Sequence, residues 1–255
     1  MSDEQPPSGP GAPDPGQSPG AASLPTGLVS AVVSLVNTGP VLLGAYTIAE
    51  LTAVDAIVDF LEARPSDEVL AEAVRSLAAR ELLLAGSTSE QVQVRGDLGI
   101  AVAFQQRART VLDARATGTE VGEPWRILLL PQPERICMMV RIDALGVHQI
   151  GLYTMDQALD ILTGWLPTGS SPDGGREVDG EALIADAERS ALVTVIRYTA
   201  EGSAEVAGET TDMVLSRNDG RLHIMTRDPE SSEHLIRTGE QGKDAVRERV
   251  AALLP

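Results

Sequence analysis

Histidine and cysteine, which carry much of the nucleophilic, acid–base and metal chemistry of proteins, are few in this sequence. The three histidines, His148, His223 and His234, are scattered, and none has a partner at the H-x-x-x-H or C-x-x-C spacing of a metal site. His223 lies between two apolar residues, so we expect a solvated strand histidine pointing away from the core, because no cysteine or G-x-S-x-G serine accompanies it. We therefore predict a non-enzymatic protein with no catalytic residue, metal ion or cofactor.

Cys137 and the glycine-containing segments offer no further chemistry. Cys137 is the single cysteine, which excludes an intrachain disulfide and fits a reducing cytoplasm. It lies in the apolar run Ile136–Val140, a pattern that predicts a small buried side chain rather than a reactive thiol. The common phosphate-binding motifs, G-x-x-x-x-G-K-[ST] and G-x-G-x-x-G, do not occur.

The charge of the chain limits its partners. With 37 Asp and Glu against 20 Lys and Arg, the formal net charge is −17, which disfavours nucleic acid and anionic membranes as partners. Arg107, Arg109 and Arg115 form a short basic strip, but acidic residues are interspersed through residues 67–115, so we interpret the strip as a solvated face. Lys243 is the only lysine among the 20 basic residues, a usage that indicates a GC-rich and plausibly actinobacterial genome.

The sequence contains the same block twice, a β-meander followed by one amphipathic helix. The strands and helices of these blocks would position the binding residues. The first copy has expected strands at 125–130, 136–142 and 147–153, then a capping box from Thr154 to Gln157. The second has expected strands at 191–199, 210–217 and 221–227, with a hairpin turn at Asn218-Asp219-Gly220, then a capping box from Thr238 to Gln241. This pattern predicts an α+β fold with an antiparallel sheet, pseudo-duplicated meander-plus-helix units and flanking helices.

The remaining segments flank these units. Residues 1–26 are rich in Pro and Gly, which predicts a disordered tail. Residues 28–36 and 41–46 read either as a hairpin or as a helix plus a strand, and the Asn-Thr-Gly-Pro turn between them argues against a membrane span. We expect helices from a capping box at Thr47 to about residue 63, from a Ser66 cap to Gly86, at 98–106 and at 179–189, with short strands at 91–95 and 110–115. We expect one domain over 27–255, with pseudo-repeats at about 92–165 and 179–255.

Two stretches of the chain resemble the EspG family of type VII (ESX) secretion-associated proteins. The first is EAVRSLAARELL (Glu72–Leu83) followed by VQVRGDLGIAVAFQQRARTVLDAR (Val92–Arg115), which has the family's Arg-rich helix, short strand, helix and VLDAR-like strand. The second is Ala204–Pro255, with EVAGETTDMVLSRNDGRLHIMTRD and a terminal helix ending in AALLP. The Pro-rich tail, residues 28–46 and the scarcity of aromatic residues depart from the family pattern.

The resemblance implies a cytosolic, chaperone-like adaptor that binds the tip of a helical PE–PPE-like secretion substrate. It also implies a central antiparallel sheet in quasi-two-fold arrangement. No family motif fixes the contact residues, so we choose outward positions of the last meander from the sheet pattern: Arg197, His223 and Met225, and also Met213 if its face does not belong to the core. The alternative is a winged-helix-type transcriptional regulator, although the helix it would use for recognition has more acidic than basic residues. The partner's identity and the oligomeric state stay open.

Overall fold

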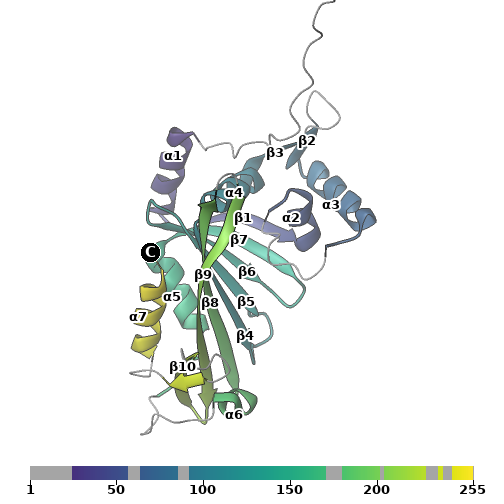
Figure 1. Cartoon of the computed structure of the whole chain (residues 1–255). Coiled ribbons are helices and arrows are strands. Elements are labelled where there is room, and N and C mark those ends of the chain that lie inside the picture. Colours follow the sequence, from purple (N-terminus) through teal and green to yellow (C-terminus); the bar gives the residue numbers. More distant parts are fainter. Residues whose placement is uncertain are drawn as a thin grey trace, which may run out of the picture.

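A computed structural model describes residues 25–56, 64–85, 92–170, 180–201, 204–227, 235–237 and 243–254. The expected tail, except its last two residues, and the capping box at Thr238 lie outside these described residues. The described part forms one nine-stranded antiparallel sheet, a two-stranded sheet and seven helices (Figure 1). The strands of the large sheet, in spatial order, are β1 (Val41–Thr47), β7 (Val147–Thr154), β6 (Ile136–Ile142), β5 (Arg126–Pro131), β4 (Thr110–Thr117), β8 (Arg189–Glu201), β9 (Ala204–Asn218), β10 (Arg221–Arg227) and β11 (Leu235–Arg237).

The sheet is pseudo-symmetric about its middle pair of strands, β4 and β8. These two strands pair antiparallel, and β5–β6–β7 continue outward from β4 as β9–β10–β11 continue from β8. Each meander is preceded by one helix, α4 (Gly96–Arg107) or α6 (Gly180–Ala185), and followed by another, α5 (Met155–Trp165) or α7 (Lys243–Leu253). Such an order is what a two-fold axis between β4 and β8 would generate. The α+β fold with duplicated meander-plus-helix units is therefore confirmed, with four strands per unit instead of the three expected.

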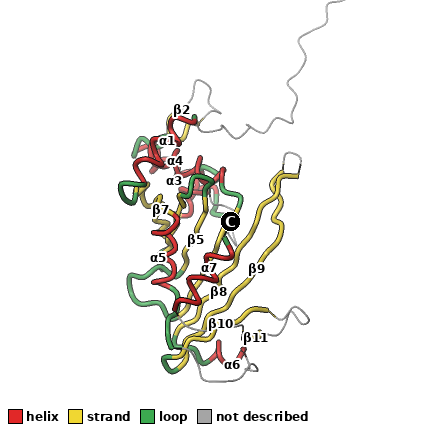
Figure 2. Tube along the Cα trace, turned by 90° about the vertical axis from the view of Figure 1, so that its left-hand side faces the viewer, coloured by secondary structure: helices red, strands yellow, loops and turns green. Residues whose placement is uncertain are grey.

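Helices α5 and α7 lie together on one face of the sheet, where both units share one core. Figure 2 shows the two helices side by side in front of the strands. Leu162 of α5 and Val250 of α7 are fully buried there, together with Leu112 of β4 and Leu215 of β9. Successive side chains of a strand point to opposite faces, so every second residue of the central strands belongs to this core, and in β5 and β6, which are buried on both faces, the intervening residues belong to a second core.

A second apolar core lies on the opposite face, under the N-terminal helices. It joins α1 (Thr26–Val36), α2 (Ile48–Ala53), α3 (Asp67–Ala79) and α4 to the half of the sheet made by β1, β7, β6 and β5. The small hairpin of β2 (Leu83–Ala85) and β3 (Val92–Val94) follows α3. These elements cover one half of this face (Figure 1).

Local signals in the sequence explain several element boundaries. The hydroxyls of Thr47 and Thr154 each accept a hydrogen bond from the backbone N–H three residues on. The side chains of Glu50 and Gln157 in turn accept one from the backbone N–H of the threonine, so both described capping boxes are confirmed. The predicted hairpin turn is also confirmed. Asp219 and Gly220 have φ of 49° and 71°, the conformation that a two-residue turn between twisted strands requires.

Three element predictions need correction. Helix α2 ends at Ala53 because Asp55 adopts φ 56° and the N–H of Ala56 bonds to the carbonyl of Leu51, a Schellman motif; residues 57–63 lie outside the described part. Helix α3 ends in the same way, at Ala79 with Glu81 in the left-handed conformation, well before the expected stop at Gly86, and Leu83–Ala85 form β2. Helix α6 ends at Ala185 and Arg189 already starts β8, whose pairing with β4 replaces the predicted end of that helix.

The N-terminal segment resolves into the second of its two alternatives, a helix plus a strand. α1 starts at Thr26, and β1 becomes the edge strand of the large sheet by pairing with β7. Among the described residues, no helix is long and apolar enough to cross a membrane.

Candidate partner-binding site

Three of the four predicted contact residues are buried. Met213 belongs to the core beneath α5 and α7, whereas His223 and Met225 lie on the opposite face of the sheet, and all three are less than a tenth exposed. On that face α6 covers β9 next to His223, because the hydroxyl of Ser216, its cross-strand partner, donates to the carbonyl of Leu183. The expectation of an outward, exposed side chain is therefore wrong for His223 and Met225, and Met213 belongs to the core, the case in which the prediction left it out.

Arg197 is partly buried and contacts the end of helix α7. Its guanidinium donates to the carbonyl of Leu253, at the C-terminal end of α7, with an N–O distance of 3.1 Å. Cations are favourable at that end of a helix, where backbone carbonyls have no intrahelical partner. The four predicted residues thus do not form one surface.

A different set of side chains forms a partly exposed patch across the middle of the sheet. Its positions are set by the register of β4, β8 and β9, which places Arg115 opposite Leu192 and Leu192 opposite Val214 in one row. All of them alternate with residues of the core beneath α5 and α7, so they face the other way. We call the two neighbouring rows the central patch: Arg115, Leu192, Val214, Asp113, Thr194 and Asp212.

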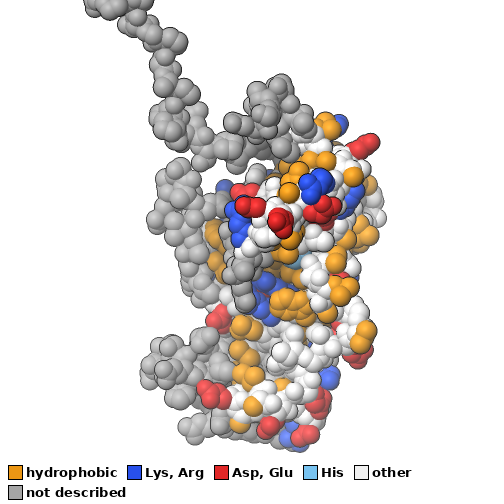
Figure 3. All heavy atoms as spheres, turned by 90° about the vertical axis from the view of Figure 1, so that its right-hand side faces the viewer, with side chains coloured by type: hydrophobic (Ala, Val, Ile, Leu, Met, Phe, Trp, Pro, Cys, Tyr) orange, Lys and Arg blue, Asp and Glu red, His pale blue; other side chains and the backbone are white. Residues whose placement is uncertain are grey.

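The central patch lies beyond the part of this face that the N-terminal helices cover. Leu192 is 36% exposed, and the Arg115 side chain is 49% exposed. Figure 3 looks at this face and shows hydrophobic and basic side chains together below the N-terminal helices. An apolar centre among polar groups is the usual composition of a protein-binding surface.

Hydrogen bonds fix the polar half of the patch in place. Asp113 accepts two bonds from the guanidinium of Arg126, at 2.8 and 2.9 Å, and both side chains are almost completely buried. Arg115 binds the same carboxylate from the solvent side at 2.9 Å, so one buried acid holds two arginines. Thr194 donates to Asp212 at 2.7 Å across the next strand pair. These bonds give the polar half of the patch a defined geometry.

Sequence reasoning missed the patch, although one signal for it was present. Thr110–Arg115 was expected to be a strand, and within it Asp113 and Arg115 alternate with apolar residues, which marks the opposite face as polar. What the sequence did not show is that β4 pairs with both β5 and β8. This pairing places Arg126 and Leu192 on either side of Arg115, and the pairing of β8 with β9 adds Asp212 to the row of Asp113.

Two of the residues considered for chemistry, Cys137 and His148, are buried. Cys137 is fully buried, and burial raises the pKa of its thiol to about 12, so the small buried side chain that was expected is confirmed. His148 is also buried; burial lowers the pKa of its imidazole, whose Nδ1 lies 2.9 Å from the carbonyl oxygen of Gly146. Among the described residues, no group of three or more His, Cys, Asp or Glu side chains gathers as a metal site would require.

No protein-family model matches the chain, and no curated protein sequence matches it either.

Proposed function

We propose that this protein is a non-enzymatic, cytosolic, chaperone-like adaptor that binds a helical type VII secretion substrate of the PE–PPE kind through the central patch. The observation that carries the proposal is the open middle of a pseudo-symmetric sheet, where Leu192 lies among fixed polar groups. The arrangement fits the quasi-two-fold antiparallel sheet that the EspG resemblance implies. A helix laid across β4, β8 and β9 would cover Leu192 and Val214 and meet Arg115.

Charge makes a protein partner more suitable here than nucleic acid. The chain carries −17 formal charges, and in the central patch the exposed arginine is paired with an acid. A sequence-tolerant nucleic-acid surface needs several unpaired cations that follow a phosphate backbone.

The winged-helix alternative is less well supported by the topology. The order α1-β1-α2-α3-β2-β3 resembles that of a winged helix, but β1 pairs with β7 in the large sheet and leaves β2 and β3 as a separate pair. The would-be recognition helix α3 begins with Asp67 and Glu68, and its Arg75 is paired with Glu72 at 2.8 Å. A surface of this charge would repel DNA.

A pull-down from the protein's own cytosol, followed by mass spectrometry and size-exclusion chromatography, tests the proposal. We expect the wild-type bait to recover a PE–PPE-like helical pair in a stoichiometric complex. Leu192→Asp should abolish recovery, because it places a charge in the apolar centre of the patch. Leu145→Asp is the matched control, since Leu145 is 88% exposed in the β6–β7 turn, outside the patch.

Two results would contradict the proposal. Recovery of DNA or of a regulator's partners instead of a helical pair would contradict the secretion function, although the description of the fold would still hold. If both leucine variants lost the helical pair equally, the central patch could not be its specific binding site.

A further inference from the structure

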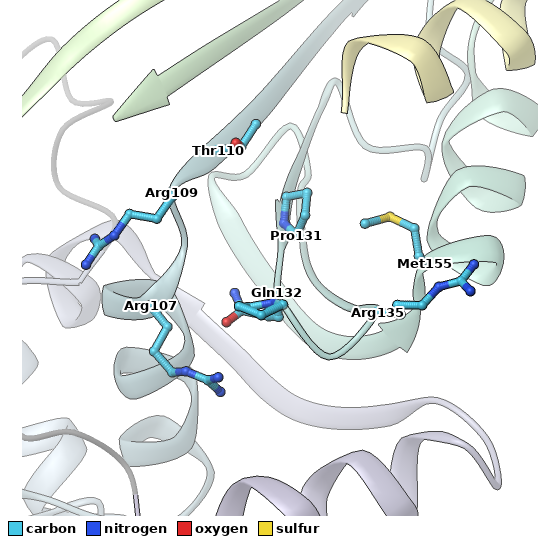
Figure 4. A pocket seen from close by; sticks show the side chains of 8 residues that line it. Arg107, Arg109, Thr110, Pro131, Gln132, Arg135 and Met155 are labelled. Atoms are coloured by element: carbon cyan, nitrogen blue, oxygen red, sulfur yellow. The ribbon is translucent and has the colours of Figure 1, made fainter. Parts of the chain in front are cut away.

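A cavity of about 400 Å³ opens at one end of the sheet, at a place that the adaptor function does not use. It lies where α4 leads into β4, β5 turns into β6, and α5 begins (Figure 4). The wall combines apolar groups with three arginines in a strongly acidic chain, and consists of Arg107, Arg109, Thr110, Pro131, Gln132, Pro133, Arg135 and Met155.

Gln132 lines this cavity and carries a buried hydrogen-bond acceptor. The residue is 5% exposed, and its amide nitrogen donates to the carbonyls of Phe104 and Leu130 at 3.1 and 3.2 Å. These two bonds fix the orientation of the amide, so its oxygen must act as the acceptor. That oxygen is buried and has no hydrogen-bond partner among the described residues. A buried polar atom without a partner is costly, and a ligand that donates to it would remove that cost.

Arg107 also lines the cavity and carries a buried donor, beside a carboxylate oxygen of Glu134 that is likewise buried and unpartnered among the described residues. One terminal nitrogen of its guanidinium is paired with Glu134, and the ion pair holds the side chain over the ring of Phe104. The other terminal nitrogen is buried and has no hydrogen-bond partner within the part of the chain that the structure describes. In Figure 4 the amide of Gln132 lies between Arg107 on one side and Arg135 with Met155 on the other.

The turn that carries Gln132 and Arg135 has a defined shape. The N–H of Arg135 bonds to the carbonyl of Gln132, with Pro133 at the second turn position, where its fixed φ is favourable. Arg135 adopts φ 60°, a left-handed conformation that is uncommon for a residue with a side chain. This geometry holds the exposed Arg135 at the edge of the cavity opposite Arg107.

We propose that this cavity binds an acidic peptide segment in which an apolar residue lies next to an acidic one. A peptide backbone offers both missing partners, an N–H for Gln132 and a carbonyl for Arg107. Pro131 and Met155 form an apolar wall for the neighbouring side chain, and Arg135 attracts the carboxylate. The ligand differs from a helical secretion substrate, whose backbone groups bond to each other, so the inference does not rest on the proposed function.

The test is an NMR titration of the full-length, ¹⁵N-labelled protein with the blocked dipeptide N-acetyl-Leu-Glu-amide. We expect saturable shifts of the Gln132 side-chain amide, with a dissociation constant of about 1 mM for a ligand of this size. The neutral analogue N-acetyl-Leu-Gln-amide and the variant Arg135→Asn should each weaken binding about threefold, because each removes one exposed charge pair.

Arginine-to-lysine variants provide the matched control. Arg107→Lys keeps a charge for Glu134 but removes the second terminal nitrogen, so we expect about tenfold weaker binding, as for a lost charge-assisted hydrogen bond. Arg75→Lys makes the same change in an exposed pair with Glu72 on α3 and should bind like wild type. The proposal is overturned if Gln132 does not shift, if the acidic and neutral dipeptides bind equally, or if Arg107→Lys binds like Arg75→Lys.

Discussion

Individual residues of this protein join elements that are distant in the chain, and Glu50 is one example. Its carboxylate closes the capping box of α2 and also accepts hydrogen bonds from Ser76 at 2.8 Å and Arg80 at 3.0 Å, both near the end of α3. Burial raises the pKa of Glu50, but the bonds from the Thr47 N–H and from Ser76, with the charge of Arg80, outweigh burial, so its pKa lies below the ordinary value.

A lowered pKa predicts how stability depends on pH at this residue. Because the unfolded carboxyl titrates near pH ~4.3 and the folded one lower, the contribution of Glu50 is complete above that pH and is lost as pH falls through the folded pKa. Glu50→Gln should therefore unfold at lower urea than wild type at pH 7, and the difference should shrink in acid. Glu72→Gln removes the same charge from an exposed helix position. If the urea midpoint fell equally in both variants, the effect would come from the change in net charge and not from the contacts of Glu50.

The Asp113 pair gives a second prediction at the residue scale. Asp113→Asn leaves the buried Arg126 without its anion, and we expect a loss of about 3 kcal/mol in the free energy of unfolding. Arg126→Met should cost less, because Asp113 keeps its bonds to Arg115. Urea denaturation of the two variants measures the difference. A greater loss in Arg126→Met would contradict this account of the pair.

At the scale of single elements, the sequence predicted the first residues of helices better than their last residues. Starts carry a chemical signal, a Ser or Thr hydroxyl that bonds to an early backbone N–H, and the described caps at Thr47, Ser66 and Thr154 all formed. The ends of α2 and α3 use Asp55 and Glu81 in left-handed conformations instead of a glycine. Aspartate adopts this conformation only occasionally and glutamate has no preference for it, so neither residue marks a helix end in the sequence. The prediction of an exposed face on the last meander was wrong for a related reason. The alternation of apolar and polar residues defines the two faces of a strand but does not show which elements cover each face.

The left-handed Glu81 supports a prediction about this helix end. Glu81→Gly should raise the free energy of unfolding by about 1 kcal/mol, because glycine adopts positive φ without a Cβ clash. The same change inside the helix, Glu72→Gly, should lower it by about 1 kcal/mol. Thermal unfolding of both variants is the measurement. A loss of stability in Glu81→Gly would show that its side chain contributes more than its backbone strain costs.

On the scale of the whole molecule, the two pseudo-repeats depend on one another. Their helices α5 and α7 complete a single core, and the β4–β8 pair joins the meanders into one sheet. Arg189, at the start of the second unit, donates to the carbonyl of Trp165 at 2.7 Å and pairs with Glu123 at 2.8 Å, both in the first unit. The sequence contained the repeat itself, but this mutual burial is a long-range property that local patterns cannot express.

Shared burial predicts that the two units unfold together, and the positions of the tryptophans allow a direct test. Trp125 and Trp165, the two tryptophans of the chain, both lie in the first unit, and Arg189 of the second unit lies over the Trp165 ring, so their fluorescence reports the first unit together with its contact to the second. Val250→Ala removes two methyl groups from a fully buried position of α7, in the second unit, and should cost about 2 kcal/mol. If the units form one cooperative structure, the fluorescence midpoint in urea should fall by the same amount as the circular dichroism midpoint. Leu162→Ala, in the first unit, should shift both midpoints together in the same way. A fluorescence midpoint unchanged by Val250→Ala would mean that the first unit is stable without the second, and the fold would then be two adjacent domains.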